Sequence, residues 1–465
     1  MANRTSASAI AKAVARGDVS ATEVVTAALA RAEQIAPLNA FTVIDHEGAL
    51  KAARQIDADP DKAGKPLLGV PFAAKDFTPT AGHPTTRGSW STGDAITDWD
   101  PAYVRRLKAA GAVLIGKTTT PEFAYSGFTH SPRWGVTRNP YDPDRTPGGS
   151  SGGAAVVVAT GCVPIAEGTD MGGSVRIPAA LSGVVGMKPS LGRIPMDILP
   201  MGSDMISHFG PLARSVEDAA LFLSVTQGPD AGDILSQPNP GPVWPVTAAK
   251  RPRLALSMDL GYYRVAPGVA AQIDAAVDRL RDAGAIVEMV DIKWTHALND
   301  AWLELWGVTL AAAWGDALDS YRDRMDPEVV ALMDAGRKVS GVRVRQLEVM
   351  RHRIWADLAS IYEHYDALLT PTCATTAPSV DANQGEFEVL DAQGLYPGLD
   401  MTCIFNLVGE CPALSVPVGL SDGLPVGMQV IGPRFADAEV LGIGRLIEAT
   451  TPALAPPDWR SRIAR

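Results

Sequence analysis

Three short segments contain residues whose types could together perform acyl-transfer chemistry. Lys75 follows an apolar run, Ser150 lies within Pro-Gly-Gly-Ser-Ser-Gly-Gly, and Ser174 follows two glycines. A serine hydroxyl becomes a strong nucleophile when a neighbouring base accepts its proton. A buried lysine can be that base, because loss of hydration disfavours the ammonium form and lowers the pKa. Taken alone, Lys75 would be interpreted as an exposed residue at a strand end, so the catalytic interpretation depends on the serines.

The glycine–serine segment, residues 147–153, is open to several interpretations. It could be a flexible turn, a helix N-terminus, a backbone cradle for an anion, or the nucleophile elbow of an α/β-hydrolase. An elbow directly follows a strand, but the prolines of the preceding Asn-Pro-Tyr-Asp-Pro-Asp-Arg-Thr exclude a central strand. An elbow also needs a later histidine, and two of the four candidates, His352 and His364, lie in helical patterns. We therefore disfavour the hydrolase elbow.

The third segment, residues 168–178, offers backbone N–H groups that could converge on one oxygen atom. These groups belong to Met171, Gly172, Gly173 and Ser174. Glycine permits such an arrangement because it tolerates positive φ and close approach of a ligand. The alternative is a tight turn in which Asp170 and Arg176 form a structural ion pair.

Residues 111–118 satisfy the Walker A pattern of nucleotide-binding proteins. That pattern binds phosphate only as a loop between a strand and a helix. Here the middle residues Ala-Val-Leu-Ile are typical of the strand itself, a helical pattern precedes them, and Pro121 follows soon after. We therefore exclude ATP binding.

Helices that alternate with buried strands must position these segments. A capping box at Ser20–Glu23 begins a helix, and the sequence up to about residue 58 predicts two helices. Another helix is expected after Asp100, with Pro101 in its first turn and Gly111 at its end, before the strand Ala-Val-Leu-Ile-Gly.

The order of helix, glycine and strand recurs at residues 267–292 and in the helical stretch ending at 361–372. Near the C-terminus we expect two adjacent strands with a turn at 421–423, then a helix over 437–450. Residues 228–252 are rich in proline and glycine and predict a long connection. This alternation predicts an α/β fold with a mostly parallel or mixed sheet.

Composition restricts the class of protein. The chain has 465 residues and a net charge of -11, which argues against nucleic-acid binding, since such proteins usually present a basic face. The scattered cysteines match no zinc-binding spacing and are typical of a reducing compartment; they are Cys162, Cys373, Cys403 and Cys411. The N-terminal sequence lacks the apolar run of a signal peptide, and no apolar stretch is long enough to span a membrane. We expect a cytoplasmic protein without a membrane partner.

In order and spacing, the three segments together resemble the amidase signature family, whose members use a Ser–Ser–Lys triad. The resemblance also covers GAVLIGKTTTPEFA, GPLARSVEDAA, LLTPT and the stretch from FNLVGECPALSVPVGL to GLPVGMQVIGPRFAD. It extends from residue 66 to about residue 445 and is weaker from about 230 to 360.

The resemblance implies an α/β amidase-signature fold, with a large mixed, mostly parallel central sheet covered by helices on both faces. We expect a single domain over residues 1–465. Its expected parts are N-terminal helices at 1–58, a catalytic core at 66–227, a variable substrate-shaping segment at 228–360 and the C-terminal part of the core at 361–465.

By the same resemblance, Ser174 is the nucleophile, Ser150 is a bridging serine after a cis peptide bond at Gly149–Ser150, and Lys75 is the base. The neutral amine accepts the proton of Ser150 while Ser150 accepts that of Ser174. Ser174 then attacks the acyl carbon, and water hydrolyses the acyl-enzyme. Supporting roles fall to Ser151, Asp170 and Arg176, and the family requires no metal or organic cofactor.

The resemblance assigns the oxyanion hole to the backbone amides of Met171, Gly172, Gly173 and Ser174. Loss of one such donor typically costs about 100–1,000-fold in rate. Many family members have threonine where this chain has Met171. Because the role is that of a backbone N–H, catalysis should persist, and the missing hydroxyl favours a less polar substrate.

Expected pocket residues come from the same resemblance and from a tryptophan stripe. Trp302, Trp306 and Trp314 lie near one helix face, where they could form ordinary core or an aromatic wall over the substrate. The residues expected at the pocket are Ala124, Tyr125, Gly127, Gly149, the wall Ile198–Met201, and Trp306. An apolar pocket predicts aryl or aliphatic amides, although a hydroxyl nucleophile can also attack esters and carbamates.

One family branch is the A-type subunit of the tRNA-dependent amidotransferase. That branch has a Ser-Arg-Tyr-Asp-Gly stretch for which this chain has no counterpart. We therefore expect a stand-alone amidase that converts a small-molecule amide to an acid and an amine or ammonia, as a monomer or homodimer. The alternatives are an esterase or carbamate (urethane) hydrolase with the same triad, and an amidotransferase A-type subunit that acts on glutamine in a complex.

Overall fold

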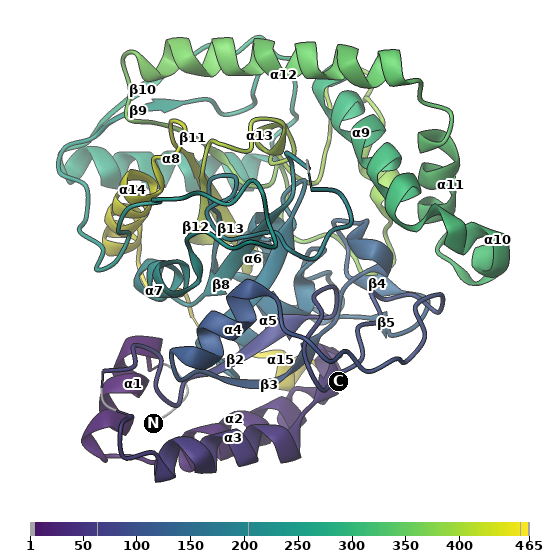
Figure 1. The fold of residues 1–465 in the computed structure, drawn as a ribbon. Helices are drawn as coiled ribbons and strands as arrows, with labels where there is room; N and C mark the ends of the chain where they lie inside the picture. The colour runs from purple at the N-terminus through teal and green to yellow at the C-terminus, as the bar shows by residue number, and fades with distance from the viewer. Residues whose placement is uncertain (1–4, 63, 203, 456, 464–465) are drawn as a thin grey trace.

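The computed structural model describes residues 5–62, 64–202, 204–455 and 457–463. Its centre is an 11-stranded sheet with the strand order β1-β3-β2-β6-β8-β7-β12-β13-β11-β9-β10 (Figure 1). The strands are β1 Phe41–Ile44, β2 Pro71–Lys75, β3 Val113–Thr118, β6 Ile165–Asp170, β7 Val185–Lys188, β8 His208–Ala213, β9 Arg253–Leu256, β10 Ile286–Met289, β11 Ala367–Pro371, β12 Ala413–Ser421 and β13 Leu424–Ile431. We expected one domain over residues 1–465, and the positions missing from the four ranges above lie outside the described residues.

The expected large mixed sheet is confirmed, but the expectation that it is mostly parallel is wrong. Among the described strands, four neighbouring pairs are parallel, namely β3–β2, β2–β6, β11–β9 and β9–β10. The other six pairs are antiparallel. The expectation of a parallel sheet came from the helix–glycine–strand pattern, which is typical of parallel crossovers. Three of the central antiparallel pairs involve β7 and β8, and no local sequence pattern indicated these two strands.

Helices cover both faces of this sheet, as expected. In β12, the side chains of Leu414 and Val416 face Gly444 of α14, whereas Ser415 faces the side of Ala180 in α6. Because successive side chains of a strand point to opposite faces, α6 and α14 lie on opposite sides. Helix α5 packs with α6, and α7 and α8 pack with α14. Their bounds are α5 Gly152–Ala159, α6 Arg176–Ser182, α7 Val216–Thr226, α8 Pro267–Asp282 and α14 Asp437–Thr450.

The N-terminal region differs from the two helices predicted up to residue 58. Its described part, residues 5–58, contains three α-helices, a short 3₁₀ helix and a strand: α1 Ala7–Arg16, α2 Ala21–Gln34, η2 Ala36–Leu38, β1, and α3 His46–Ala58. The predicted capping box at Ser20 and Glu23 does begin α2. The helical region is interrupted between α2 and α3 because β1 pairs with β3. The side chain of Asp45 then caps α3 by accepting a hydrogen bond from the backbone N–H of Gly48.

Several locally encoded elements are confirmed. Helix α4 Ala102–Ala109 precedes β3, which is a buried strand, so residues 111–118 do not form a phosphate loop. Helix α8 is followed by β10, and α12 Gly341–Tyr362 is followed by β11. Strands β12 and β13 form a hairpin whose turn residues Asp422 and Gly423 both have positive φ, as a tight hairpin requires.

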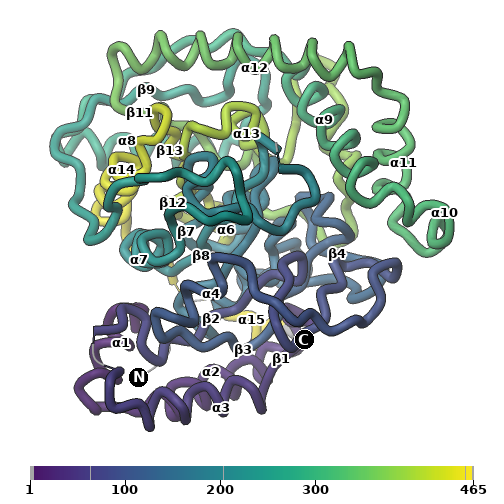
Figure 2. Tube along the Cα trace, in the orientation of Figure 1, coloured from purple at the N-terminus to yellow at the C-terminus, as the bar shows by residue number. Residues whose placement is uncertain are grey.

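Residues 297–362 form a helical layer beside the sheet, seen in green in Figures 1 and 2. Its helices are α9 Ala297–Trp314, α10 Leu318–Tyr321, α11 Pro327–Gly336 and α12. Helix α9 packs against both α11 and α12. Among the described residues, no helix combines the length and the apolar character needed to cross a membrane.

Candidate active site

Lys75 is the last residue of β2, and its side chain is completely buried. Its Nζ atom donates hydrogen bonds to Oγ of Ser150 at 2.6 Å and to Oγ1 of Thr169 at 2.8 Å. Strands β2 and β6 are parallel neighbours, so their carboxyl ends meet at one edge of the sheet. This edge brings together the amine and two hydroxyl groups.

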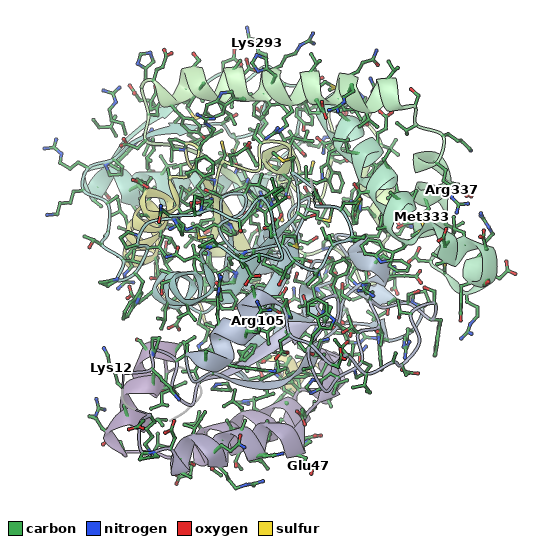
Figure 3. The ribbon with its side chains drawn as sticks, in the orientation of Figure 1. Lys12, Glu47, Arg105, Lys293, Met333 and Arg337 are labelled. Carbon is green, nitrogen blue, oxygen red and sulfur yellow. The ribbon has the colours of Figure 1, made fainter. Side chains whose placement is uncertain are left out.

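Burial lowers the pKa of Lys75 to about 7, although the charges of Glu167 and Asp170 partly oppose this effect. The charged side chains of Lys12, Glu47 and Lys293 instead point outward from the fold (Figure 3). The buried amine of Lys75 is therefore neutral in a large fraction of molecules at neutral pH, which a proton acceptor requires.

Glu167 supports this strand end from within the protein. Its Oε2 atom accepts hydrogen bonds from the backbone N–H of Lys75 and from the hydroxyl of Tyr103, both at 2.9 Å. Thr78 donates to its Oε1 atom at 3.2 Å. Burial raises the pKa of Glu167. The bonds fix the backbone of Lys75 while its side chain reaches toward Ser150.

Ser150 and Ser151 lie immediately before α5. The peptide bond Gly149–Ser150 is cis, as expected. The backbone N–H of Ser151 donates to the carbonyl oxygen of Ser174 at 3.2 Å, and Ser151 Oγ donates to the carbonyl oxygen of Thr169 at 3.4 Å. These bonds join the glycine–serine segment to the segment that carries Ser174.

Ser174 lies in the turn between β6 and α6 and is half-buried. The turn is anchored by Asp170, whose carboxylate accepts hydrogen bonds from Nε and Nη2 of Arg176 at 2.9 and 2.8 Å. Burial would raise the pKa of Asp170, but the charge and hydrogen bonds of Arg176, helped by Asn406, outweigh it and lower that pKa well below its usual value. The carboxylate is therefore ionised throughout the ordinary pH range.

Arg176 uses its whole guanidinium group in this network. Besides Asp170, it donates to the carbonyl oxygen of Thr402, to Oε1 of Gln429 and to Oδ1 of Asn406. A guanidinium has five N–H donors, and five hydrogen bonds are present. The predicted pair of Asp170 and Arg176 is thus a fully buried ion pair that fixes the turn.

The four backbone amides expected to form an oxyanion hole are not equivalent. The N–H of Gly173 donates to Oδ1 of Asp170 at 2.8 Å, so this amide already has a partner. Met171, Gly172 and Ser174 line a cleft. The carbonyl oxygen of Met171 accepts from Nε1 of Trp302 at 2.7 Å, and that of Gly172 accepts from Oγ1 of Thr402 at 2.6 Å. These bonds orient the peptide planes of the turn.

The cleft beside Ser174 encloses about 30 Å³. Its lining residues are Ala124, Tyr125, Ser126, Gly127, Met171, Gly172, Ser174, Ile177, Trp302, Leu303, Trp306, Gln384, Glu388 and Asp400. The space beside Ser174 is therefore narrow.

Tyr125, Gly127 and Trp306 lie at the cleft, in the region where the sequence placed the pocket. Gly149 is buried next to Ser150, outside the set of lining residues. Ile198 also lies outside that set and packs against the main hydrophobic core. Its neighbour Asp197 accepts a hydrogen bond from the backbone of Ala102 at 2.8 Å, which holds this segment against α4.

The tryptophan side chains of α9 lie in two different environments. Trp302 and Trp306 line the cleft. Trp314 packs away from it against Phe77 and Phe123, with ring centroids 5.5 and 5.4 Å apart. One helix therefore contributes both a wall of the cleft and a buried aromatic cluster.

Sequence reasoning missed several residues of this site. Thr169 and Glu167 precede Asp170 in β6, and their position in the strand next to β2 was the available signal. Gln384, Glu388 and Asp400 reach the cleft from a segment with little regular structure, for which no local signal exists. Among the described residues, no group of three or more His, Cys, Asp and Glu side chains is placed to hold a metal ion.

Comparison with known proteins places this geometry in a family. A family model described as Amidase matches residues 23–441. The A-type subunit of the glutamyl-tRNA(Gln) amidotransferase of Symbiobacterium thermophilum is 35% identical over 94% of this chain and 94% of that protein. An acylamidase of Rhodococcus erythropolis is 34% identical over 96% of this chain and 95% of its own length.

A solved structure of a bacterial aryl acylamidase of the amidase signature enzymes superimposes with a TM-score of 0.89. It covers 97% of this chain and 96% of its own, at 29% sequence identity. The chain therefore belongs to the amidase signature family. It is an amide-hydrolysing enzyme.

Proposed function

We propose that Ser174 is the nucleophile of this amidase, that Ser150 relays its proton and that Lys75 is the base. The observation that carries the proposal is the 2.6 Å hydrogen bond between the buried Lys75 amine and the Ser150 hydroxyl. The position of Ser174 in the wall of the cleft and its hydrogen-bonded link to Ser151 support its part.

The reaction follows from these positions. The neutral Lys75 amine accepts the proton of Ser150 while Ser150 accepts that of Ser174, and Oγ of Ser174 bonds to the amide carbon. Backbone N–H groups of the turn stabilise the oxyanion, for which Met171, Gly172 and Ser174 are the candidates. The relay then returns the proton to the leaving nitrogen, the C–N bond breaks, and water cleaves the acyl-enzyme.

We infer that the chain works alone, as a monomer or homodimer in the cytoplasm. The four cysteines are buried free thiols, in keeping with a reducing compartment. The A-type subunit of an amidotransferase is the second candidate, because a relative with that name is 35% identical over almost the whole chain. The aryl acylamidase neighbour and the tryptophan side chains at the cleft support aryl amides as substrates.

Fluorophosphonate labelling tests the nucleophile. We expect the probe to label purified wild-type protein at Ser174 and to leave Ser174→Ala unlabelled. We also expect the purified chain alone to hydrolyse members of a panel of aryl amides. Persistent labelling of Ser174→Ala would contradict the assignment, and turnover that requires glutamine and added partner proteins would favour the amidotransferase function.

A further inference from the structure

Two carboxyl groups lie in the wall of the same cleft as Ser174. They belong to Glu388 and Asp400. Among the described residues that line this cleft, none is a lysine, arginine or histidine. The site that receives the substrate therefore offers acidic groups without a basic side chain to neutralise them.

Arg176, whose charge acts on Asp400, does not donate a hydrogen bond to it. The backbone N–H of Thr402 donates to Oδ1 of Asp400 at 3.1 Å, and the Thr402 hydroxyl, whose one proton is shared with the carbonyl oxygen of Gly172, lies 2.9 Å from the same atom. The five donors of Arg176 bond to other acceptors, so its charge acts on Asp400 only through space. Burial raises the pKa of Asp400, as expected for a carboxylate with incomplete compensation.

Glu388 has a similar environment. Its pKa is raised to about 7, chiefly by burial and also by the charges of Glu328, Asp400 and Asp300, against the opposing effect of a hydrogen bond with Gln384. A cation in the cleft would reverse this balance, because an opposite charge at close range favours the ionised carboxylate. The same cation would then gain charge-assisted hydrogen bonds.

Aromatic side chains provide a second, independent indication of a cation. Tyr125, Trp302 and Trp306 line the same cleft. The face of an aromatic ring attracts an ammonium group, and most strongly when both are removed from water. Carboxyl groups and aromatic side chains that line one cleft are a combination that can bind an alkylammonium group.

We propose that Glu388 and Asp400 select amide substrates that carry a positively charged amino group, which binds in the cleft beside the carbonyl that Ser174 attacks. The inference rests on the proposed function and refines its substrate class. The proposed substrate class is more polar than the one we expected from Met171 in place of threonine, because Glu388 and Asp400 supply the polar contacts. We expect Oδ2 of Asp400 to contact the amino group, since Thr402 already bonds to Oδ1.

Matched pairs of substrates test this selection. Alanine para-nitroanilide and isobutyric para-nitroanilide differ only by an ammonium in place of a methyl group on the acyl side. N-aminopropyl benzamide and N-butyl benzamide differ in the same way on the amine side. For each pair, the measured quantity is kcat/KM of the charged substrate divided by kcat/KM of the neutral substrate. This ratio is compared between the wild type and each variant, so that the intrinsic reactivities of the substrates cancel.

In Glu388→Gln and in Asp400→Asn we expect this ratio to fall by about 10- to 100-fold for at least one pair. Glu386→Gln is the control, because Glu386 is exposed, lies two residues from Glu388 and does not line the cleft. Glutamine also preserves its capping role at Asn383. Unchanged ratios for both pairs in both cleft variants would overturn the inference.

Protection of wild-type Ser174 from the fluorophosphonate gives a readout that does not depend on any variant. The charged member of the selected pair should protect at a concentration at least about tenfold lower than its neutral partner. Equal protection by both members of both pairs would overturn the inference while leaving the proposed function intact. An unlabelled Ser174 with no turnover of any amide would overturn the proposed function, and the inference with it.

Discussion

The hydroxyl of Thr169 accepts a hydrogen bond from the buried amine of Lys75, across two neighbouring parallel strands. Thr169 directly precedes Asp170, the residue that anchors the turn carrying Ser174. One strand end therefore holds both the proposed base and the turn with the proposed nucleophile. A shift of β6 relative to β2 would disturb both groups together.

Replacement of Lys75 by alanine should remove the base. We expect kcat/KM for an aryl amide to fall by about 100- to 10,000-fold, the usual contribution of a positioned general base. Lys108→Ala is the control, because Lys108 lies on the outer side of α4 and pairs there with Asp100. Full activity of Lys75→Ala with unchanged thermal stability would remove Lys75 from the mechanism.

The pH dependence of the wild-type enzyme follows from the lowered pKa of Lys75. Only the neutral amine accepts a proton, so kcat/KM should rise about tenfold per pH unit below the pKa and level off above about 7. A steady-state profile with an aryl amide measures this midpoint. A rise that continued toward the ordinary lysine pKa of about 10.4 would show that burial does not tune this amine.

Thr169→Val removes one hydroxyl with little change of shape. Its oxygen accepts a hydrogen bond from Lys75 and so favours the ammonium form. We therefore expect the midpoint of the pH profile to move to lower pH and kcat/KM to fall by about tenfold, because the amine loses a positioning contact. In the control Thr160→Val, the lost hydroxyl bonds only within α5, so the profile should not move. An unmoved midpoint in Thr169→Val would exclude this role.

Gly172→Ala should misplace the turn of Ser174. A methyl group at this position would overlap the indole of Trp302, which also bonds to the carbonyl oxygen of Met171. We expect kcat/KM to fall by about 100-fold, a typical effect of small misplacement of reacting groups. Gly341→Ala, where open space surrounds the new methyl group, is the control.

The overlap can be confirmed in a second background. In Trp302→Ala the obstruction is absent, so the additional substitution Gly172→Ala should cost much less than it does in the wild type. An equal loss in both backgrounds would show that Gly172 is needed for a reason other than its contact with the indole.

Arg176→Met should destabilise the fold strongly, because it leaves Asp170 buried and unpaired. We expect the free energy of unfolding in urea to decrease by about 3–5 kcal/mol. Arg345→Met breaks an exposed pair with Glu348, which is screened by water, and should leave the free energy of unfolding nearly unchanged. The double variant Asp170→Asn, Arg176→Met should recover part of the lost stability, because it removes the unpaired charge. If it recovers none, the loss comes mainly from the other hydrogen-bond partners of Arg176.

Local patterns in the sequence identify the elements that form through nearby contacts. The capping box of α2, the helix α14 and the hairpin of β12 and β13 were predicted because their signals lie within a few residues. Strands β7 and β8 were missed, since their partners are distant in the sequence. The antiparallel centre of the sheet depends on these strands and could not be predicted.

The residues of the site also differ in whether a local sequence pattern could reveal them. Lys75, Ser150 and Ser174 were predicted as site residues because their glycine- and proline-rich segments have a recognisable order. Glu388 and Asp400 were missed, because only the fold brings their irregular segment to the cleft. The expected wall at Ile198 was placed from the family resemblance alone, whereas the hydrogen bond of Asp197 to α4 holds that segment against the core.

Helix α9 supplies Trp302 and Trp306 to the cleft, whereas Lys75, Ser150 and Ser174 come from β2 and from the segments before α5 and α6. The tryptophans of the cleft and the residues of the proposed triad thus come from separate segments of the chain. Because Trp302 also bonds to the carbonyl oxygen of Met171 in the turn of Ser174, a mutant library in α9 that varies Leu303 and Trp306 but keeps Trp302 is the natural starting point for directed evolution of specificity.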